Sequence, residues 1–313
     1  MLTNLKYILT SFMFVFALHC YSQTGWSVQN SGTTFPLTTI QMVDNNTGFA
    51  CGVNGTFIKT INSGQSWTGT SGGTNVRFGQ IYFINQNTGW IIHYNDTVGA
   101  NILKTTNSGI NWFIQYDGTG LYMSSLFFAT EQDGWAGTGS GFVVHTTNGG
   151  NNWVTNSTGL SYIISLHFIN TTTGWAGGGS GRIFKTTNSG TNWTSQTSSV
   201  GNVNAIYFIN QTAGWACGQG GLSLRTTNTG TNWVSQPAGT TATLNSVYFI
   251  DSNTGWMVGD FGKAFYSTNS GVTWTPKNVG VTLKLESIQF INANTGWICG
   301  EFGTILKTTT GGF

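Results

Sequence analysis

One nine-residue pattern recurs along the 313-residue chain and sets its architecture. The copy at 185–193 reads basic–Thr–x–Asn–x–Gly–x–x–Trp. The Asn side chain can accept bonds from backbone N–H groups two residues on and close a tight turn, and the Gly supplies the positive φ that such a turn needs. Burying the Trp would contribute on the order of 4–6 kcal/mol at most. Near copies lie at 59–67, 104–112, 145–153, 225–233 and 266–274, and a broken copy lies at 307–313.

A second mark, a Gly followed by an aromatic residue, fixes the repeat length. The aromatic positions are Phe49, Trp90, Trp135, Trp175, Trp215, Trp256 and Trp297. Successive marks are 40 to 45 residues apart by subtraction. Twelve of the 13 Trp residues fall on the second mark or on a turn, and the remaining one is Trp26. Residues 26–29 resemble the segment that begins at Trp193, so we expect the N-terminal segment to complete the last repeat.

Each repeat is predicted to contain four short strands. Continuous apolar runs at 81–84, 206–209 and 247–250 predict first strands covered on both faces. The Gly-aromatic pair starts the second strand, and segments such as 182–185 or 222–225 form the third. The turn then leads into a fourth strand at the Trp. Helical periodicity is absent.

Repeats of this length with four strands each are typical of a β-propeller. We therefore predict an all-β chain with one domain at 23–313, a seven-bladed propeller of four-stranded blades. Pairing of the N-terminal strand with the last blade would close the ring and remove an open sheet edge. The alternative is that the broken last turn marks a fragment.

Residues 1–22 are interpreted as a signal peptide. Lys6 precedes an apolar run at 7–18 that is too short to span a bilayer, and small residues favour cleavage after Ser22. Lipidation of Cys20 is the alternative, although His19 rather than a small residue precedes it. We expect an exported protein, periplasmic, cell-surface or extracellular, with no transmembrane segment.

Charge is scarce, and this bears on the class of partner. Only 6% of residues are charged and the net charge is +2, or about +1 after loss of Lys6 (2 − 1). So small a charge argues against nucleic acid as a partner.

Cys51, Cys217 and Cys299 occupy equivalent places in three repeats, which favours buried small side chains over disulfides. We expect a monomer.

The turn pattern resembles the Asp-box, or BNR repeat, with Asn in place of the usual Asp. Together with segments such as 253–259 (Asn-Thr-Gly-Trp-Met-Val-Gly), the chain resembles the photosystem II assembly and stability factor-like propellers. The resemblance covers residues 24–313, and the Ser22-Gln23 site and Asn/Thr-rich repeats resemble exported Bacteroidetes-type members. It implies a non-catalytic scaffold whose basic residues bind a partner. The seventh turn departs from the pattern, with Thr310 in place of Asn.

Asp-boxes also occur in sialidases and other glycoside hydrolases, so an enzyme is an alternative. Such chemistry needs two positioned carboxyl groups, or a Tyr nucleophile with an acid and an arginine cluster. Asp44, Asp133 and Asp251 are interpreted as turn formers, and the other acids are scattered. The His and Cys residues lack metal-ligand spacing. We assign no catalytic residue, no metal and no cofactor.

The basic position of the turn is the first candidate for binding, since rotation of the repeat would generate a ring of cations that attracts acidic partners. Alternatively, each long side chain covers a neighbouring aromatic ring with its methylenes. The six residues are Lys59, Lys104, His145, Lys185, Arg225 and Lys307.

Irregular loops are the second candidate, because binding residues often lie on loops of a rigid scaffold. The second repeat has four extra residues between Trp90 and Lys104, which we expect to expose Tyr94, Asn95 and Asp96. The loops between repeats also diverge. Candidate residues in these places are Arg77, Tyr94, Asp96, Tyr122 and Tyr162.

These observations predict a secreted, non-catalytic propeller that binds a protein partner or a surface glycan. A glycan-cleaving enzyme and a structural cell-envelope component are the alternatives.

Overall fold

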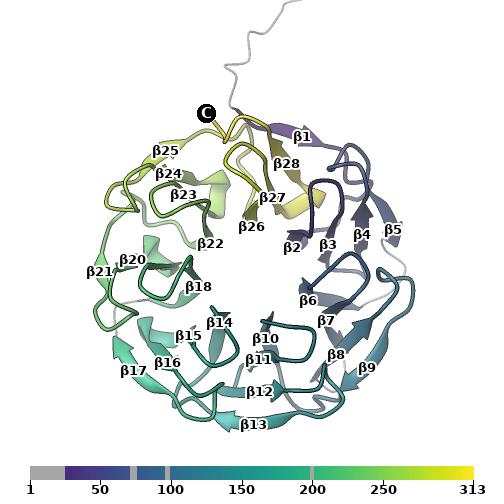
Figure 1. Ribbon diagram of the computed structural model, residues 1–313. Coiled ribbons are helices and arrows are strands. Elements are labelled where there is room, and N and C mark those ends of the chain that lie inside the picture. Colours follow the sequence, from purple (N-terminus) through teal and green to yellow (C-terminus); the bar gives the residue numbers. More distant parts are fainter. Residues whose placement is uncertain (1–24, 71–75, 96–98, 198–200) are drawn as a thin grey trace, which may run out of the picture.

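The computed structural model describes residues 25–70, 76–95, 99–197 and 201–313. The described residues form seven four-stranded antiparallel sheets arranged as blades around a central axis (Figure 1). The predicted all-β, seven-bladed propeller is therefore confirmed. The predicted signal peptide at 1–22 lies outside the described residues.

The blades share one order of strands, from the axis outward. The first strands are β2 (Leu37–Met42), β6 (Arg77–Phe83), β10 (Met123–Phe128), β14 (Ile163–Phe168), β18 (Val203–Phe208), β22 (Leu244–Phe249) and β26 (Leu285–Phe290). The second strands are β3 (Gly48–Gly52), β7 (Gly89–Asn95), β11 (Gly134–Thr138), β15 (Gly174–Gly178), β19 (Gly214–Gly218), β23 (Gly255–Gly259) and β27 (Gly296–Gly300).

The third strands are β4 (Phe57–Thr60), β8 (Gly99–Thr105), β12 (Phe142–Thr146), β16 (Ile183–Thr186), β20 (Ser223–Thr226), β24 (Ala264–Ser267) and β28 (Ile305–Thr308). The outer strands are β5 (Thr68–Thr70), β9 (Phe113–Tyr116), β13 (Val154–Ser157), β17 (Thr194–Thr197), β21 (Val234–Ser235), β25 (Thr275–Lys277) and, for blade 7, β1 (Ser27–Gln29). Short 3₁₀ turns join the second and third strands of blades 4 to 7: η1 (Gly179–Gly181), η2 (Gln219–Gly221), η3 (Asp260–Gly262) and η4 (Glu301–Gly303).

The predicted strands hold with three differences. The first strands begin three or four residues before the predicted apolar runs and end one residue before those runs end, as β18 does at 203–208 against 206–209. All second strands begin at the Gly of the Gly-aromatic pair, whereas β16 and β20 begin and end one residue later than predicted. The first strands are not covered on both faces, as in β18, where Asn204, Ala205 and Tyr207 are only half-buried. The prediction was wrong on this point because alternate side chains of these strands face the central channel.

Aromatic pairs join neighbouring blades. The aromatic of the Gly-aromatic pair stacks on the Phe that ends the first strand of the next blade, as Trp175 does on Phe208 with 3.5 Å between ring centroids. The Trp of the turn, here Trp233, meets the same Phe edge-on at 5.6 Å. Trp175 Nε1 also donates to Thr229 O in the next blade, at 3.2 Å. These contacts repeat between most blades and make the blade interface a continuous aromatic core.

The turn itself is held by two side chains. Thr186 Oγ1 accepts the N–H groups of Asn188 and Gly190, and Asn188 Oδ1 accepts that of Asn192 at 2.9 Å. The Asn therefore bonds a backbone group four residues on, not two as predicted, because the Thr hydroxyl takes the nearer N–H. Ser189 and Gly190 both have positive φ, at 61° and 85°.

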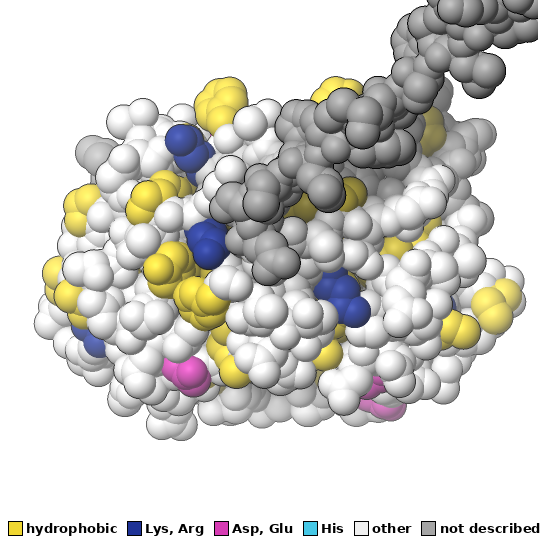
Figure 2. All heavy atoms as spheres, turned by 90° about the horizontal axis from the view of Figure 1, so that it is seen from above, with side chains coloured by type: hydrophobic (Ala, Val, Ile, Leu, Met, Phe, Trp, Pro, Cys, Tyr) yellow, Lys and Arg dark blue, Asp and Glu magenta, His cyan; other side chains and the backbone are white. Residues whose placement is uncertain are grey.

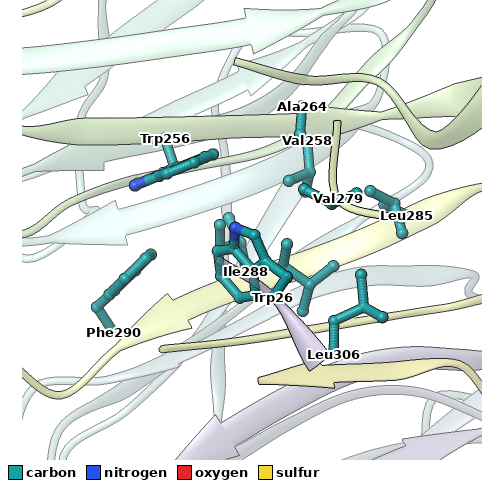
Figure 3. Close-up of a cluster of buried hydrophobic side chains, with 10 residues drawn as sticks. Trp26, Trp256, Val258, Ala264, Val279, Leu285, Ile288, Phe290 and Leu306 are labelled. Carbon is teal, nitrogen blue, oxygen red and sulfur yellow. The ribbon is translucent and has the colours of Figure 1, made fainter. Parts of the chain in front are cut away.

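The ring closes as predicted. Strand β1 pairs with β28, so the outer strand of blade 7 comes from the start of the described chain (Figure 1). Trp26 is buried and meets Trp256 and Phe290 edge-on, at 5.6 and 5.8 Å between centroids (Figure 3). It takes the place that the turn Trp takes elsewhere.

The ring has two faces, which we name by their turns. The box face carries the Asn–Gly turns and the turns between first and second strands, which bond one another, as Ser189 N does with Thr172 O at 2.9 Å. The far face carries the turns between second and third strands, η1 to η4 included, and the connections between blades.

Candidate functional site

In five blades the residue at the basic position lies against an aromatic ring. Each of the six residues is the direct cross-strand partner of its blade's Gly-aromatic residue, as Lys185 is of Trp175. Lys185 Nζ lies 5.6 Å from the centre of the Trp175 ring, and His145 stacks on Trp135 at 4.7 Å with an interplanar angle of 3°. Lys59, Lys104 and Lys307 lie over their partner rings at 5.0 to 5.6 Å.

Two of these lysines also bond the next blade. Lys104 Nζ donates to Gly149 O at 2.9 Å, and Lys307 Nζ donates to Ser63 O at 2.6 Å. Burial lowers the pKa values of Lys104, Lys185 and Lys307 below the usual lysine value, with Glu131 opposing the shift at Lys104. Their charge thus serves the blade interface, and the geometry matches the alternative in which the side chain covers the ring. Whether the six basic residues also bind a partner stays a prediction.

Three of the variable-loop residues come together on the far face. The Arg77 guanidinium carbon lies 5.3 Å from the centre of the Tyr94 ring, which lies 4.9 Å from the Tyr122 ring. The Tyr94 hydroxyl donates to Met123 O, and Tyr94 is half-buried rather than exposed as expected. Arg77 is exposed, and Tyr122 is 53% exposed. We call Arg77, Tyr94 and Tyr122 the Arg–Tyr cluster.

Tyr162 does not join this cluster. Tyr162 donates its hydroxyl to Asn202 Oδ1 at 2.7 Å, which ties the connection before blade 4 to the one before blade 5. Asp96 lies outside the described residues. The four-residue insertion lengthens β7 and β8 to seven residues each, and so places Tyr94 beside Arg77.

The first strands line a central channel of about 630 Å³, and Arg77 and Glu286 are among its lining residues. Many polar side chains in the channel bond the next blade. Ser165 Oγ accepts the N–H of Ile206 at 3.0 Å, and Asn245 Nδ2 donates to Leu285 O at 2.9 Å. These side chains replace hydrogen bonds that the inner strand edges lack, so their first role is to hold the blades together.

Five aromatic residues form an arc in the channel near the box face. Tyr82, Phe127, His167, Tyr207 and Tyr248 follow one another in blades 2 to 6, with neighbouring centroids 4.8 to 5.4 Å apart. Sequence analysis did not single out these residues. The signal was present, because the next-to-last position of each first strand varies in size and polarity while its neighbours stay apolar.

Glutamine fills the same position in the two remaining blades. Gln41 accepts the N–H of Phe83 at 2.7 Å and donates to Phe83 O at 3.0 Å. Gln289 makes the equivalent pair of bonds with Met42. His167 Nε2 lies 3.0 Å from Phe208 O, and since a carbonyl only accepts, this nitrogen carries the proton. Burial lowers the pKa of His167 to about 4, so the ring is neutral at pH 7.

Two of the three Asp residues predicted to form turns hold their turns through their carboxylates. Asp44 Oδ1 accepts the N–H groups of Asn46 and Thr47, and Asp251 does the same two and three residues on, which confirms both as turn formers.

Within the described ranges, no three His, Cys, Asp or Glu side chains gather as a metal site would require. Cys51, Cys217 and Cys299 are buried and free, as predicted. No helix in the described part of the chain has the length and apolar content to cross a membrane.

Comparison with known proteins supports the fold. A family model described as "Photosynthesis system II assembly factor YCF48" matches residues 226–313, from the Asn–Gly turn of blade 5 to the last residue. No curated protein matches the chain.

Solved structures resemble nearly the whole ring. The structure described as "YCF48 bound to D1 peptide" is 20% identical with a TM-score of 0.76, over 92% of this chain and 96% of that one. "YCF48 from Cyanidioschyzon merolae" is 20% identical with a TM-score of 0.75, over 90% and 98%. The Niastella koreensis GH74 enzyme is 15% identical with a TM-score of 0.68, over 90% of this chain but 53% of that one. At these identities the likeness shows a shared fold.

Proposed function

We propose that this protein is an exported, non-catalytic propeller of the YCF48-like kind, and that it binds an acidic segment of a partner protein at the Arg–Tyr cluster. The observation that carries the proposal is an exposed guanidinium held over a tyrosine pair at the entrance of the channel. The likeness to a structure described as bound to a peptide supports this class of partner.

The chemistry of the cluster suits a carboxylate. The Arg77 guanidinium presents a fork of N–H donors that matches a carboxylate in shape. Stacking on Tyr94 restricts the rotamers of Arg77, so binding costs less side-chain entropy. The half-exposed Tyr122 ring beside it offers an apolar surface for a neighbouring side chain of the same segment.

The choice against a hydrolase rests on the acidic residues. Asp44 and Asp251 are committed to turns, and the Glu286 carboxylate at the channel pairs with Lys284 Nζ at 2.7 Å. The enzyme alternative has the match to 53% of the GH74 chain in its favour, and that match shows the fold alone. The structural-component alternative has no observation of this kind in its favour.

A crosslinking experiment tests the proposal. A photo-crosslinking residue at position 122 should capture an envelope protein that synthetic acidic peptides displace, while the same residue at Phe142, 39% exposed, should capture little. Arg77→Gln should abolish the capture. A variant with Lys59, Lys104, Lys185, Arg225 and Lys307 changed to Glu, if folded, should retain it. If the five-site Glu variant lost the capture and Arg77→Gln retained it, the binding site would be the set of basic residues instead.

A further inference from the structure

Two phenylalanines on the far face are both exposed and conformationally strained. Phe261 in η3 is 73% exposed with φ 59°, and Phe302 in η4 is 67% exposed with φ 54°. Exposed single apolar residues are ordinary, but a bulky side chain at positive φ is uncommon. Strain of this kind without compensating burial suggests a role outside folding.

Equivalent positions in other blades show what the turn itself requires. Asn54, Ser180 and Gly220 occupy the same place in blades 1, 4 and 5, with φ values of 53°, 55° and 69°. Glycine and short polar residues reach this region at low cost. Phenylalanine replaces them in two successive blades, so two rings stand at equivalent places in neighbouring turns.

The immediate surroundings of the two rings mix polar and small apolar residues. Each Phe stands between an acidic residue and a glycine, Asp260 and Gly262 in one turn and Glu301 and Gly303 in the other. Phe261 also borders a hollow of about 650 Å³ with Pro237, Lys263 and residues 239–242. Figure 2 shows the outer rim of the propeller at the side where the described chain ends meet. Among the described residues in this view, hydrophobic side chains form small separate groups and not a large patch of the kind on which a protein interface centres.

The carboxylates beside the rings are fixed acceptors. Asp260 Oδ1 accepts a hydrogen bond from Asn245 Nδ2 at 3.0 Å, and Glu301 Oε2 accepts one from Lys284 N at 3.3 Å. The local charges nearly balance, with Lys263 and Lys284 against Asp260, Glu286 and Glu301. The surface therefore attracts neither polyanions nor polycations strongly.

We propose that Phe261 and Phe302 are stacking platforms for a neutral linear polysaccharide. The C–H face of a sugar ring carries weak positive charge and suits the negative face of an aromatic ring. Its hydroxyls need acceptors of the kind that Asp260 and Glu301 provide beside each platform. Two equivalent platforms on successive blades match a ligand that repeats along its length. The inference does not rest on the peptide site.

Affinity electrophoresis tests it, with hydroxyethyl cellulose, dextran and mannan as neutral probes and alginate as the anionic one. A neutral probe should retard the protein, and Phe261→Ser with Phe302→Ser should reduce the binding constant at least tenfold. Serine is a safe replacement because Ser180 holds the same backbone conformation in blade 4. The matched control, Phe113→Ser, removes another exposed ring, 62% exposed on β9, and should bind normally.

Either of two results would overturn the proposal: no retardation by any neutral probe, or equal retardation of the double variant and the wild type. Retardation by alginate alone would also count against it. Loss of crosslinked protein at position 122 in the double variant, without any polysaccharide binding, would assign the two rings to a protein partner instead. The Arg77→Gln variant should bind polysaccharide normally, so the two proposals can fail separately.

Discussion

The two faces of the ring are built from the same repeat but differ in how uniform they are. On the box face, a Thr or Ser hydroxyl accepts the N–H of the turn residue four positions on in every blade, from Gly64 to Gly312. On the far face, equivalent places hold Asn54, Ser180, Gly220, Phe261 and Phe302. The Arg–Tyr cluster occurs there in one place only among the described residues.

The difference separates positions that build the ring from positions that are free to recognise something. A residue whose side chain holds its own turn cannot change without cost to that turn, so it stays uniform. A residue at the positive-φ position of a far-face turn is constrained by its φ value, and it can vary between blades. Uniformity on the box face thus indicates packing, and divergence on the far face marks the better candidates for binding.

Removing a ring from the box-face packing should have the largest effect. Trp175 is fully buried, and Trp175→Ala should lower the free energy of unfolding by about 3–5 kcal/mol, through lost stacking on Phe208 and the cavity left behind. Urea unfolding followed by circular dichroism measures it. Trp175→Phe is the matched control, because Phe49 stacks on Phe83 at 3.6 Å in blade 1, and it should lose less than half as much. A loss below 1 kcal/mol for the Ala variant would refute the packing account.

Acid should weaken the same interface at His167. Its pKa is about 4 when folded and 6.5 in the reference state, so between these values the unfolded chain binds the proton and the folded chain does not. Stability should therefore fall as pH drops from 6.5 to 4, by about 3 kcal/mol at most from this group. Burial also lowers the pKa values of His93 and His145, which adds loss in the same direction.

His167→Gln separates the contribution of this residue. Gln41 and Gln289 bond the next blade from the same position, so the variant should keep the blade contact and lose only the proton site. Its stability at pH 7 should stay within about 1 kcal/mol of the wild type, with a flatter decline toward pH 4. Chemical unfolding at pH 7, 5.5 and 4.5 gives both slopes, and equal slopes would show that His167 does not carry the effect.

Sequence predicted the uniform part of the molecule well because uniformity is what a single chain displays. The spacing of the Trp residues gave the number of blades, and the match of Trp26 to Trp193 gave the closure by β1. The register of the second and third strands then follows, since each Gly-aromatic residue lies opposite the basic position of the adjacent strand.

The candidate sites were less predictable for two physical reasons. Spacing places a residue along a strand but does not say whether its charged end reaches solvent or the next blade, as Lys307 does at Ser63. Nor does it give φ, so Phe261 and Phe302 look like ordinary apolar residues in the sequence. The contact between Arg77 and Tyr94 depends on a lengthened hairpin, whose side-chain directions only the fold sets.

Relieving strain on the far face should stabilise the ring slightly. Phe302→Asn keeps the turn, since Asn54 holds the same conformation in blade 1, and removes a bulky side chain from positive φ. The free energy of unfolding should rise by about 0.5–1 kcal/mol. Thermal unfolding detects it as a small upward shift, with Phe142→Asn as a control whose native φ is not positive. A destabilised Phe302→Asn would mean that the ring packs usefully against the blade.

The smallest expected effect decides the role of the basic position. Lys185→Met keeps the methylene cover over Trp175 and removes the charge, so it should cost no more than about 0.5–1 kcal/mol, the value of a cation–π contact. Lys185→Ala also uncovers the ring and should cost more. This order, Ala worse than Met, is what a packing role requires, and urea unfolding can resolve it. If both variants were as stable as the wild type and each released the partner crosslinked at position 122, the lysine would act through its charge on a ligand, and the box face would join the far face as a binding surface.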